Sequence, residues 1–102
     1  MAKNEALFRE VNERVEAVAI RFGTDVPYDF VCECANPDCT FKLELRLDVY
    51  ESVRSDPTQF VVLPLHYTPE VEDLVVEEDS YWIVRKTGEA GDYVEQLDPR
   101  GP

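Results

Sequence analysis

Three cysteines and one histidine constrain this chain more than any other feature. Cys32 and Cys34 are two residues apart in a segment typical of a strand, so both sulfurs are expected on the same side. Asn, Pro and Asp in residues 35–38 predict a tight turn that brings Cys39 back toward them. Zinc prefers four tetrahedral sulfur or nitrogen ligands, and His66 follows an apolar run expected beside this hairpin. The sequence therefore predicts one structural zinc ion per chain, bound by Cys32, Cys34, Cys39 and His66.

The spacing leaves other interpretations open. Cys-x-Cys-x4-Cys is less diagnostic of zinc than two Cys-x2-Cys pairs, and buried thiols or redox or catalytic cysteines would give the same pattern. Taken alone, His66 would be read as an ordinary histidine. As the chain's one histidine, beside a cluster that lacks a fourth cysteine, it becomes a candidate ligand. Glu33, Asp38 and Asp56 are the reserve ligands.

The charge of the chain narrows its range of partners. The 102 residues contain 22 acidic and 10 basic side chains, which gives a formal net charge of −12. Such an excess repels phosphate backbones, so direct binding of nucleic acid is excluded as a main function. The apolar share of 44% is that of a folded domain rather than an acidic tail. The charge serves either plain solubility or an acidic face that meets a basic protein surface or imitates DNA.

The distribution of apolar residues predicts a cytoplasmic protein. Charged residues interrupt the first twenty positions, which is unlike the apolar core of a signal peptide. The longest charge-free apolar stretch, at 60–65, is far shorter than the roughly 20 residues that span a bilayer. In the cytoplasm, an odd number of cysteines favours reduced thiols or metal ligands over disulfides.

An amphipathic helix is predicted at the N-terminus. Its apolar residues recur at steps of four, four, three and four, with Asn4 as N-cap and Gly23 as the stop. We expect this stripe to face the core, with a partner-binding face as the alternative. The stripe consists of Leu7, Val11, Val15, Val18 and Phe22.

The rest of the chain predicts short strands and helices. Residues 28–34 and 41–45 form a hairpin whose turn lies inside the cysteine cluster. Thr68 is expected to cap an acidic helix with Val71, Leu74 and Val75 on its inner face and its carboxylates in solvent. The other predicted elements are a helix at 47–54, a buried strand at 60–63 and a last strand at 81–86.

This order of elements predicts an α+β fold. A single small domain over 1–96 should combine the N-terminal amphipathic helix with a small, largely antiparallel sheet and a cysteine-rich hairpin that resembles a zinc knuckle. Residues 97–102 are expected to form a flexible tail. A domain of this size is marginally stable, which makes a metal valuable to it.

Several segments also resemble a group of short uncharacterised bacterial proteins common in actinobacteria. The likeness lies in residues 4–14, in Phe-Val-Cys-Glu-Cys-Ala-Asn-Pro-Asp-Cys-Thr at 30–40, in 50–57 and in 64–66. It covers most of the chain. The resemblance implies a metal-binding role for the same four residues, whereas Leu65 and Tyr67 depart from the group's small and acidic neighbours of the histidine. It implies no activity.

The sequence favours a non-enzymatic role. Three thiolates and one imidazole fill a zinc shell and leave no position for water, and thiolate-rich zinc is a poor Lewis acid. We therefore expect a zinc-stabilised accessory or regulatory protein that binds a basic surface of another protein, with the transcription machinery as one candidate. The alternatives are a small metal- or thiol-dependent enzyme and a zinc or redox sensor.

Overall fold

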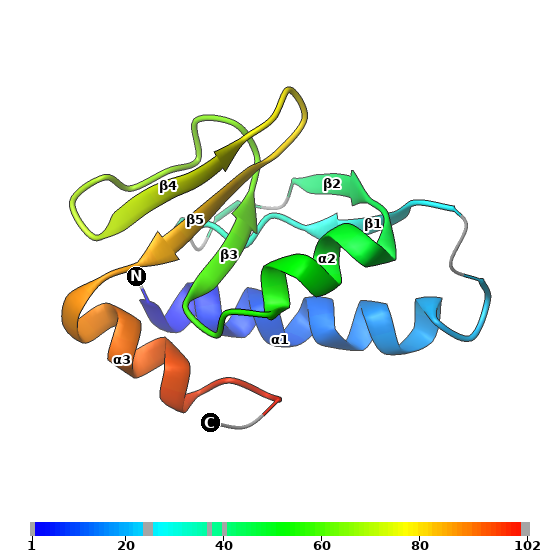
Figure 1. Ribbon diagram of the computed structural model, residues 1–102, viewed down its shortest axis with the longest axis horizontal. Helices are drawn as coiled ribbons and strands as arrows, with labels where there is room; N and C mark the ends of the chain where they lie inside the picture. The colour runs from blue at the N-terminus through cyan, green and yellow to red at the C-terminus, as the bar shows by residue number, and fades with distance from the viewer. Residues whose placement is uncertain (1, 24–25, 37, 40, 101–102) are drawn as a thin grey trace.

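Three helices and five strands make up the described part of the chain (Figure 1). The computed structural model describes residues 2–23, 26–36, 38–39 and 41–100. The α+β fold predicted from the sequence is confirmed. In chain order the elements are α1 (Ala2–Ala19), β1 (Tyr28–Val31), β2 (Lys42–Leu45), α2 (Leu47–Arg54), β3 (Gln59–Val62), β4 (Glu72–Glu77), β5 (Trp82–Lys86) and α3 (Gly88–Gln96).

The strands form two antiparallel sheets. β1 and β2 make the predicted hairpin, with Phe30 opposite Leu43, and β3, β5 and β4 make a second sheet in that order. Glu33 joins the two sheets, because its N–H donates to the Val61 carbonyl at 2.9 Å and its carboxylate accepts from the Val61 N–H at 3.0 Å. α1 runs along one side of both sheets, with α3 beside its N-terminal half (Figure 1).

The orientation of α1 is opposite to the prediction. Of the apolar stripe expected in the core, only Val15 packs against it, half-buried, and the other four residues are exposed, Phe22 by 79%. The polar residues on another side of the helix, Glu5, Arg9, Asn12 and Glu16, are buried. The alternative of a partner-binding face therefore remains.

Polar partners far along the chain explain this orientation. The Arg9 guanidinium donates to the carbonyl oxygens of Pro57 and Val94, both at 2.6 Å, and lies 5.0 Å from the centre of the Phe60 ring. Burying a polar group costs free energy unless it is hydrogen-bonded, and here the backbone ends of neighbouring elements supply the bonds. The polar face of α1 therefore pairs the carbonyl groups of Pro57 and Val94. An apolar face in the same position would leave both carbonyls without a hydrogen bond.

The ends of α1 differ in part from the expected caps. The helix begins at Ala2, so Asn4 lies within it and is not the N-cap. At the other end the Gly23 N–H donates to the Ala19 carbonyl at 3.3 Å, and Gly23 has a φ of +136°. Glycine tolerates this positive φ, which agrees with the predicted stop.

The acidic helix predicted after Thr68 is wrong. Residues 72–77 form the edge strand β4, because their backbone pairs with β5, and this pairing outweighs the helix-start signals of Thr and Pro. Glu72, which was expected in solvent, is buried and forms an ion pair with Lys86, whose ammonium group also lies against the carboxyl group of Glu5. The Glu72 carboxylate also accepts from the Thr68 N–H at 2.7 Å.

Ion pairs join two residues near the C-terminus to the fold, within the segment 97–102 that was expected to form a flexible tail. Asp98 forms an ion pair with the buried Arg54, and Arg100 forms ion pairs with Glu13, Glu16 and Glu51. These opposite charges hold residues 98–100 against α1 and α2, which composition alone did not indicate. Residues 101–102 lie outside the described part of the chain.

Candidate metal centre

The β1–β2 hairpin positions the three cysteines. The Cys32 N–H donates to the Phe41 carbonyl at 3.0 Å, which extends the pairing of β1 and β2 by one step. The Cys39 N–H donates to the Asn36 carbonyl at 3.1 Å, so a turn brings Cys39 back toward the strand, as predicted. All three thiols are buried and none is in a disulfide.

A turn after β3 positions the histidine. The His66 N–H donates to the Leu63 carbonyl at 3.0 Å, and Pro64 and Leu65 occupy the two central positions. Leu65 has a φ of +72°, the left-handed conformation that the third residue of a type II turn requires and that glycine usually supplies. His66 thereby points at the cysteines, with the Phe41 ring edge-on at 6.0 Å between centroids.

The four predicted ligands converge on one point. Their donor atoms all lie within 4.8 Å of one another. His66 Nδ1 is 3.5 Å from Cys32 Sγ and 3.7 Å from Cys39 Sγ. Tetrahedral zinc with bonds of about 2.3 Å to sulfur and 2.0–2.1 Å to nitrogen separates its ligand atoms by roughly 3.6–3.8 Å. The closest separations therefore fit a zinc ion, and the wider ones need only small side-chain adjustments.

The surroundings of the thiols favour a bound cation. Burial raises the pKa of Cys32 and of Cys34, so without a metal these thiols stay protonated and unreactive at neutral pH. A metal ion displaces the thiol protons and stabilises the thiolates. The Leu63 N–H already donates to Cys32 Sγ at 3.2 Å, a contact that would support a thiolate. Sequence reasoning missed this backbone donor, which no pattern of side chains reveals.

The reserve ligands have other roles. The buried Glu33 carboxylate accepts from Asn12, Tyr50 and Val61, which ties it to the core. Asp56 accepts from Thr58 and Arg85 on another part of the fold. Asp38 is exposed in the turn. Among the described residues, none of the three belongs to the group that can hold a metal ion.

A small hollow opens beside two of the candidate ligands. It has a volume of about 270 Å³ and is lined by Cys34, Asn36, His66 and Tyr67, among others. The hollow borders the side of the site that Cys34 and His66 form. No sequence pattern indicates this hollow, because Cys34–Asn36 and the segment after β3 lie side by side only in the folded chain.

Comparisons with protein-family models, curated proteins and solved structures found no match. The resemblance to actinobacterial proteins therefore stays a prediction. Within the described residues, no helix has the length and apolar character needed to cross a membrane.

Proposed function

We propose that this domain binds one zinc ion through Cys32, Cys34, Cys39 and His66, and that the ion is structural. The convergence of four donor atoms within 4.8 Å carries the proposal. A bound ion would cross-link the β1–β2 hairpin to the turn after β3, two segments that belong to different sheets. In a domain of this size such a cross-link supplies folding free energy that a small core lacks.

Cobalt substitution tests this part of the proposal. Co²⁺ in a closed site of three thiolates and one imidazole gives the strong visible absorption of tetrahedral cobalt together with thiolate charge transfer. We expect one equivalent of Co²⁺ to bind and one equivalent of Zn²⁺ to displace it. His66→Ala should weaken binding and change the spectrum, whereas Asp38→Asn, a change beside the cluster, should leave both unaltered. Purified protein that takes up neither ion would refute the proposal.

A second candidate function follows from the hollow beside Cys34 and His66. If one coordination position were open to it, the centre would serve a small metal-dependent enzyme or a metal or thiol sensor. Added thiocyanate or imidazole separates the two candidates. A closed centre keeps its cobalt spectrum in their presence, and an open one changes it.

We further propose that the domain acts in the cytoplasm as an accessory or regulatory protein that binds a basic surface of another protein, for example in the transcription machinery. The supporting observation is where the charges lie. Six of the chain's ten basic residues form ion pairs with its own carboxylates in the described part of the chain. Arg9 is buried on backbone carbonyls. Few cations are left to offset the exposed carboxylates.

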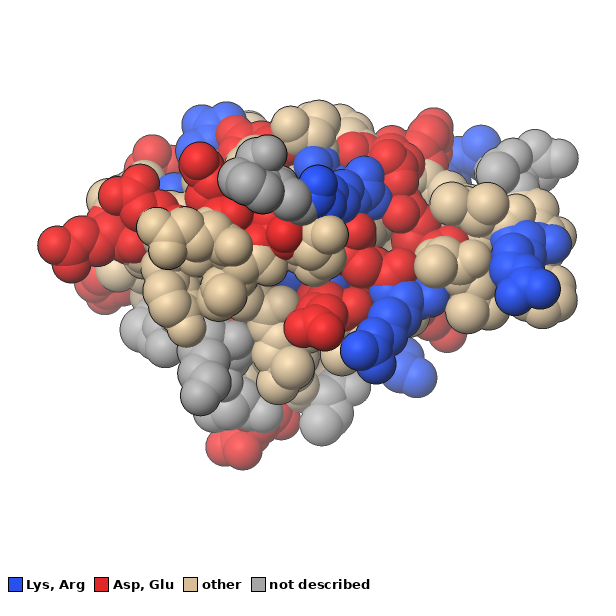
Figure 2. Space-filling model, turned by 90° about the horizontal axis from the view of Figure 1, so that it is seen from below, with Lys and Arg blue, Asp and Glu red and all other residues tan. Residues whose placement is uncertain are grey.

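Exposed carboxylates extend over several elements. In Figure 2, which views the face carrying α1, Asp and Glu cover much of the surface and Lys and Arg form separate groups. Asp73, Glu77, Glu78 and Asp79 add a further acidic edge on β4 and the turn after it. Acidic edge strands also discourage sheet aggregation, so solubility is the competing explanation.

Charge reversal at this edge tests the binding proposal. Changing Asp73, Glu77, Glu78 and Asp79 to lysine should abolish capture of the partner from lysate, and capture by the unaltered protein should fall steeply as salt shortens the Debye length. Glu72 is left unchanged because its buried ion pair with Lys86 holds the fold. If the charge-reversed protein captures the partner as well as the unaltered protein, with the same salt dependence, the acidic edge serves solubility and not binding.

A further inference from the structure

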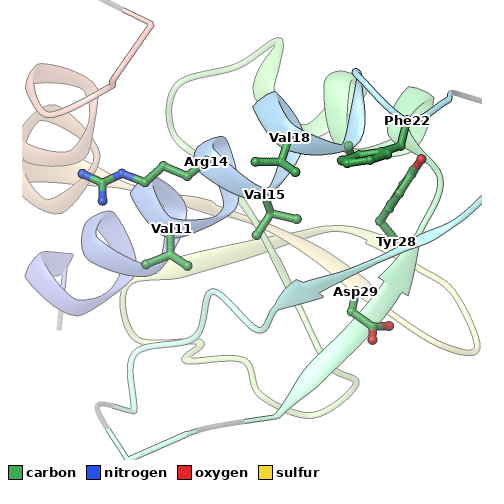
Figure 3. A pocket seen from close by; sticks show the side chains of 8 residues that line it. Val11, Arg14, Val15, Val18, Phe22, Tyr28 and Asp29 are labelled. Atoms are coloured by element: carbon green, nitrogen blue, oxygen red, sulfur yellow. The ribbon is translucent and has the colours of Figure 1, made fainter.

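An apolar groove runs between α1 and the start of β1 (Figure 3). It has a volume of about 510 Å³, and its lining is almost wholly apolar. Val11 and Val15 point from α1 toward β1, and the Tyr28 ring lies near Phe22. The Tyr28 hydroxyl donates to the Gly23 carbonyl at 2.6 Å, which fixes this end of the groove. The groove is thus built by fixed elements.

The groove exists because α1 buries a polar face. Most of the apolar stripe that would ordinarily cover a core is left outside, where Val18 is 55% exposed, while Val15 is half-buried. A contiguous exposed apolar surface on a small domain marks an interaction site more often than a chance feature. Along α1 the groove is lined from Val11 to Ala19, which is about two helical turns.

The spacing of the exposed side chains fits a helix as the occupant. Val11, Val15 and Val18 follow one another at steps of four and three residues, the pattern with which one helix packs against another. From Val11 to Val18 the row is about 10 Å long, which corresponds to two turns of a docked helix. These valines form one wall of the groove, and Tyr28 and Asp29 form the other wall.

The charges at the groove favour a basic occupant. Asp29 lines the groove, and Glu44 stands directly opposite it on β2, so two exposed carboxylates face each other across the hairpin. Like charges directly opposite each other destabilise a sheet, and the exposed Lys42 lies on the same face of β2, two residues from Glu44. On the other rim, Arg14 is already paired with Glu10. A second copy of this chain would bring another formal charge of −12 to the same place.

We propose that this groove docks an amphipathic helix of the partner protein, with apolar side chains against Val11, Val15 and Val18 and basic side chains toward Asp29 and Glu44. This inference rests on the proposed function, since it specifies how a basic partner binds. The apolar contacts supply affinity, and the two carboxylates select a basic helix over an acidic one.

Synthetic helices provide the probe. We would use a 14-residue amphipathic peptide of leucine and lysine only, a peptide with glutamate in place of lysine, and a leucine–lysine peptide whose scrambled order lacks an apolar stripe. We expect the amphipathic leucine–lysine peptide to bind at least tenfold more tightly than the other two. Amide chemical-shift changes in labelled protein should concentrate on α1 and β1.

Matched variants locate the binding. Val11→Gln with Val18→Gln makes the groove polar at exposed positions, and Leu74→Gln with Leu97→Gln makes the same change at exposed positions elsewhere. The first pair should lower the affinity for the leucine–lysine peptide at least tenfold, and the second pair should leave it unchanged. Circular dichroism and metal content verify that both proteins fold.

Three results would overturn the inference: equal affinity of the groove variant, equal binding of the scrambled peptide, or a stable dimer that Val11→Gln with Val18→Gln dissociates. The groove and the acidic edge can fail separately. If charge reversal of the β4 edge abolishes capture from lysate but the groove variant still captures the partner, the proposed function holds and the groove inference is refuted. If peptide binding depends on the groove but capture from lysate survives charge reversal of the β4 edge, only the binding role of the acidic edge is refuted.

Discussion

The side chain of Asn12 on α1 bonds to both backbone groups of Val31 at the end of β1. Its amide nitrogen donates to the Val31 carbonyl at 2.8 Å, and its amide oxygen accepts from the Val31 N–H at 2.7 Å. The same nitrogen also donates to Glu33 at 2.9 Å. Asn12 therefore takes the place of a neighbouring strand along β1 and holds the residues on either side of Cys32.

We predict that Asn12→Ala lowers the free energy of unfolding by about 2–4 kcal/mol, because it leaves buried polar groups of Val31 and Glu33 without partners. Urea denaturation measures the change. Val18→Ala on the exposed side of the same helix is the control and should alter stability by no more than about 0.5 kcal/mol. Equal losses in the two variants would contradict the buried orientation of the polar face.

Removal of the metal should destabilise the fold. We predict that Cys34→Ser, or a strong chelator, markedly lowers the urea midpoint, since structural zinc supplies on the order of 10 kcal/mol of folding free energy in favourable small domains. Asp38→Asn, which changes an exposed neighbour, should keep the midpoint. A metal-loaded protein whose midpoint does not move on chelation would show that the ion has no structural role.

Stability should depend on pH through Glu5. Burial, with Glu72 adding to it and Lys86 opposing it, raises the pKa of Glu5 from 4.5 to about 9. Between these values the folded state holds a proton that the unfolded state has lost, so stability falls as the pH rises through this window. Glu5→Gln removes this titration and should flatten the decline, whose slope is at most about 1.4 kcal/mol per pH unit.

The measurement is urea unfolding of the Glu5→Gln protein and the unaltered protein at about pH 5, 7 and 9. Glu10→Gln, at an exposed ion pair on the same helix, is the control and should follow the unaltered protein. Glutamine can still accept from Lys86, so the fold should persist. A Glu5→Gln protein with the same decline as the unaltered protein would assign the proton to another group.

The turn that carries His66 should tolerate glycine better than leucine. Leu65 is 81% exposed and has a φ of +72°, which costs a non-glycine residue roughly 1–2 kcal/mol. Glycine removes this strain but loses about 0.5–1 kcal/mol of chain entropy on folding, so we predict that Leu65→Gly stabilises by up to about 1 kcal/mol. Leu65→Ala keeps the strain and should give no gain. Equal urea midpoints for the glycine and alanine variants would refute the prediction.

Local sequence determined the elements whose signals need no distant partner. Alternation of apolar and charged residues identified the β1–β2 hairpin, and Leu47, Tyr50 and Val53 on one face identified α2. The candidate metal centre was also readable from the sequence. Metal ligands belong to few residue types, and the local turn brings the cysteines together whatever the rest of the chain does. The lone histidine was then the first choice for the fourth ligand, with Glu33, Asp38 and Asp56 in reserve.

Only the tertiary structure decided which face of α1 is buried and what residues 72–77 become. Helical periodicity gives the stripe, but the direction in which it points depends on the partners that Arg9 and Asn12 find far along the chain. Likewise, Thr68 and Pro69 signal a helix until the backbone hydrogen bonds of β5 compete for the same residues. Both outcomes rest on long-range hydrogen bonds between polar groups, whose energy no window of sequence contains.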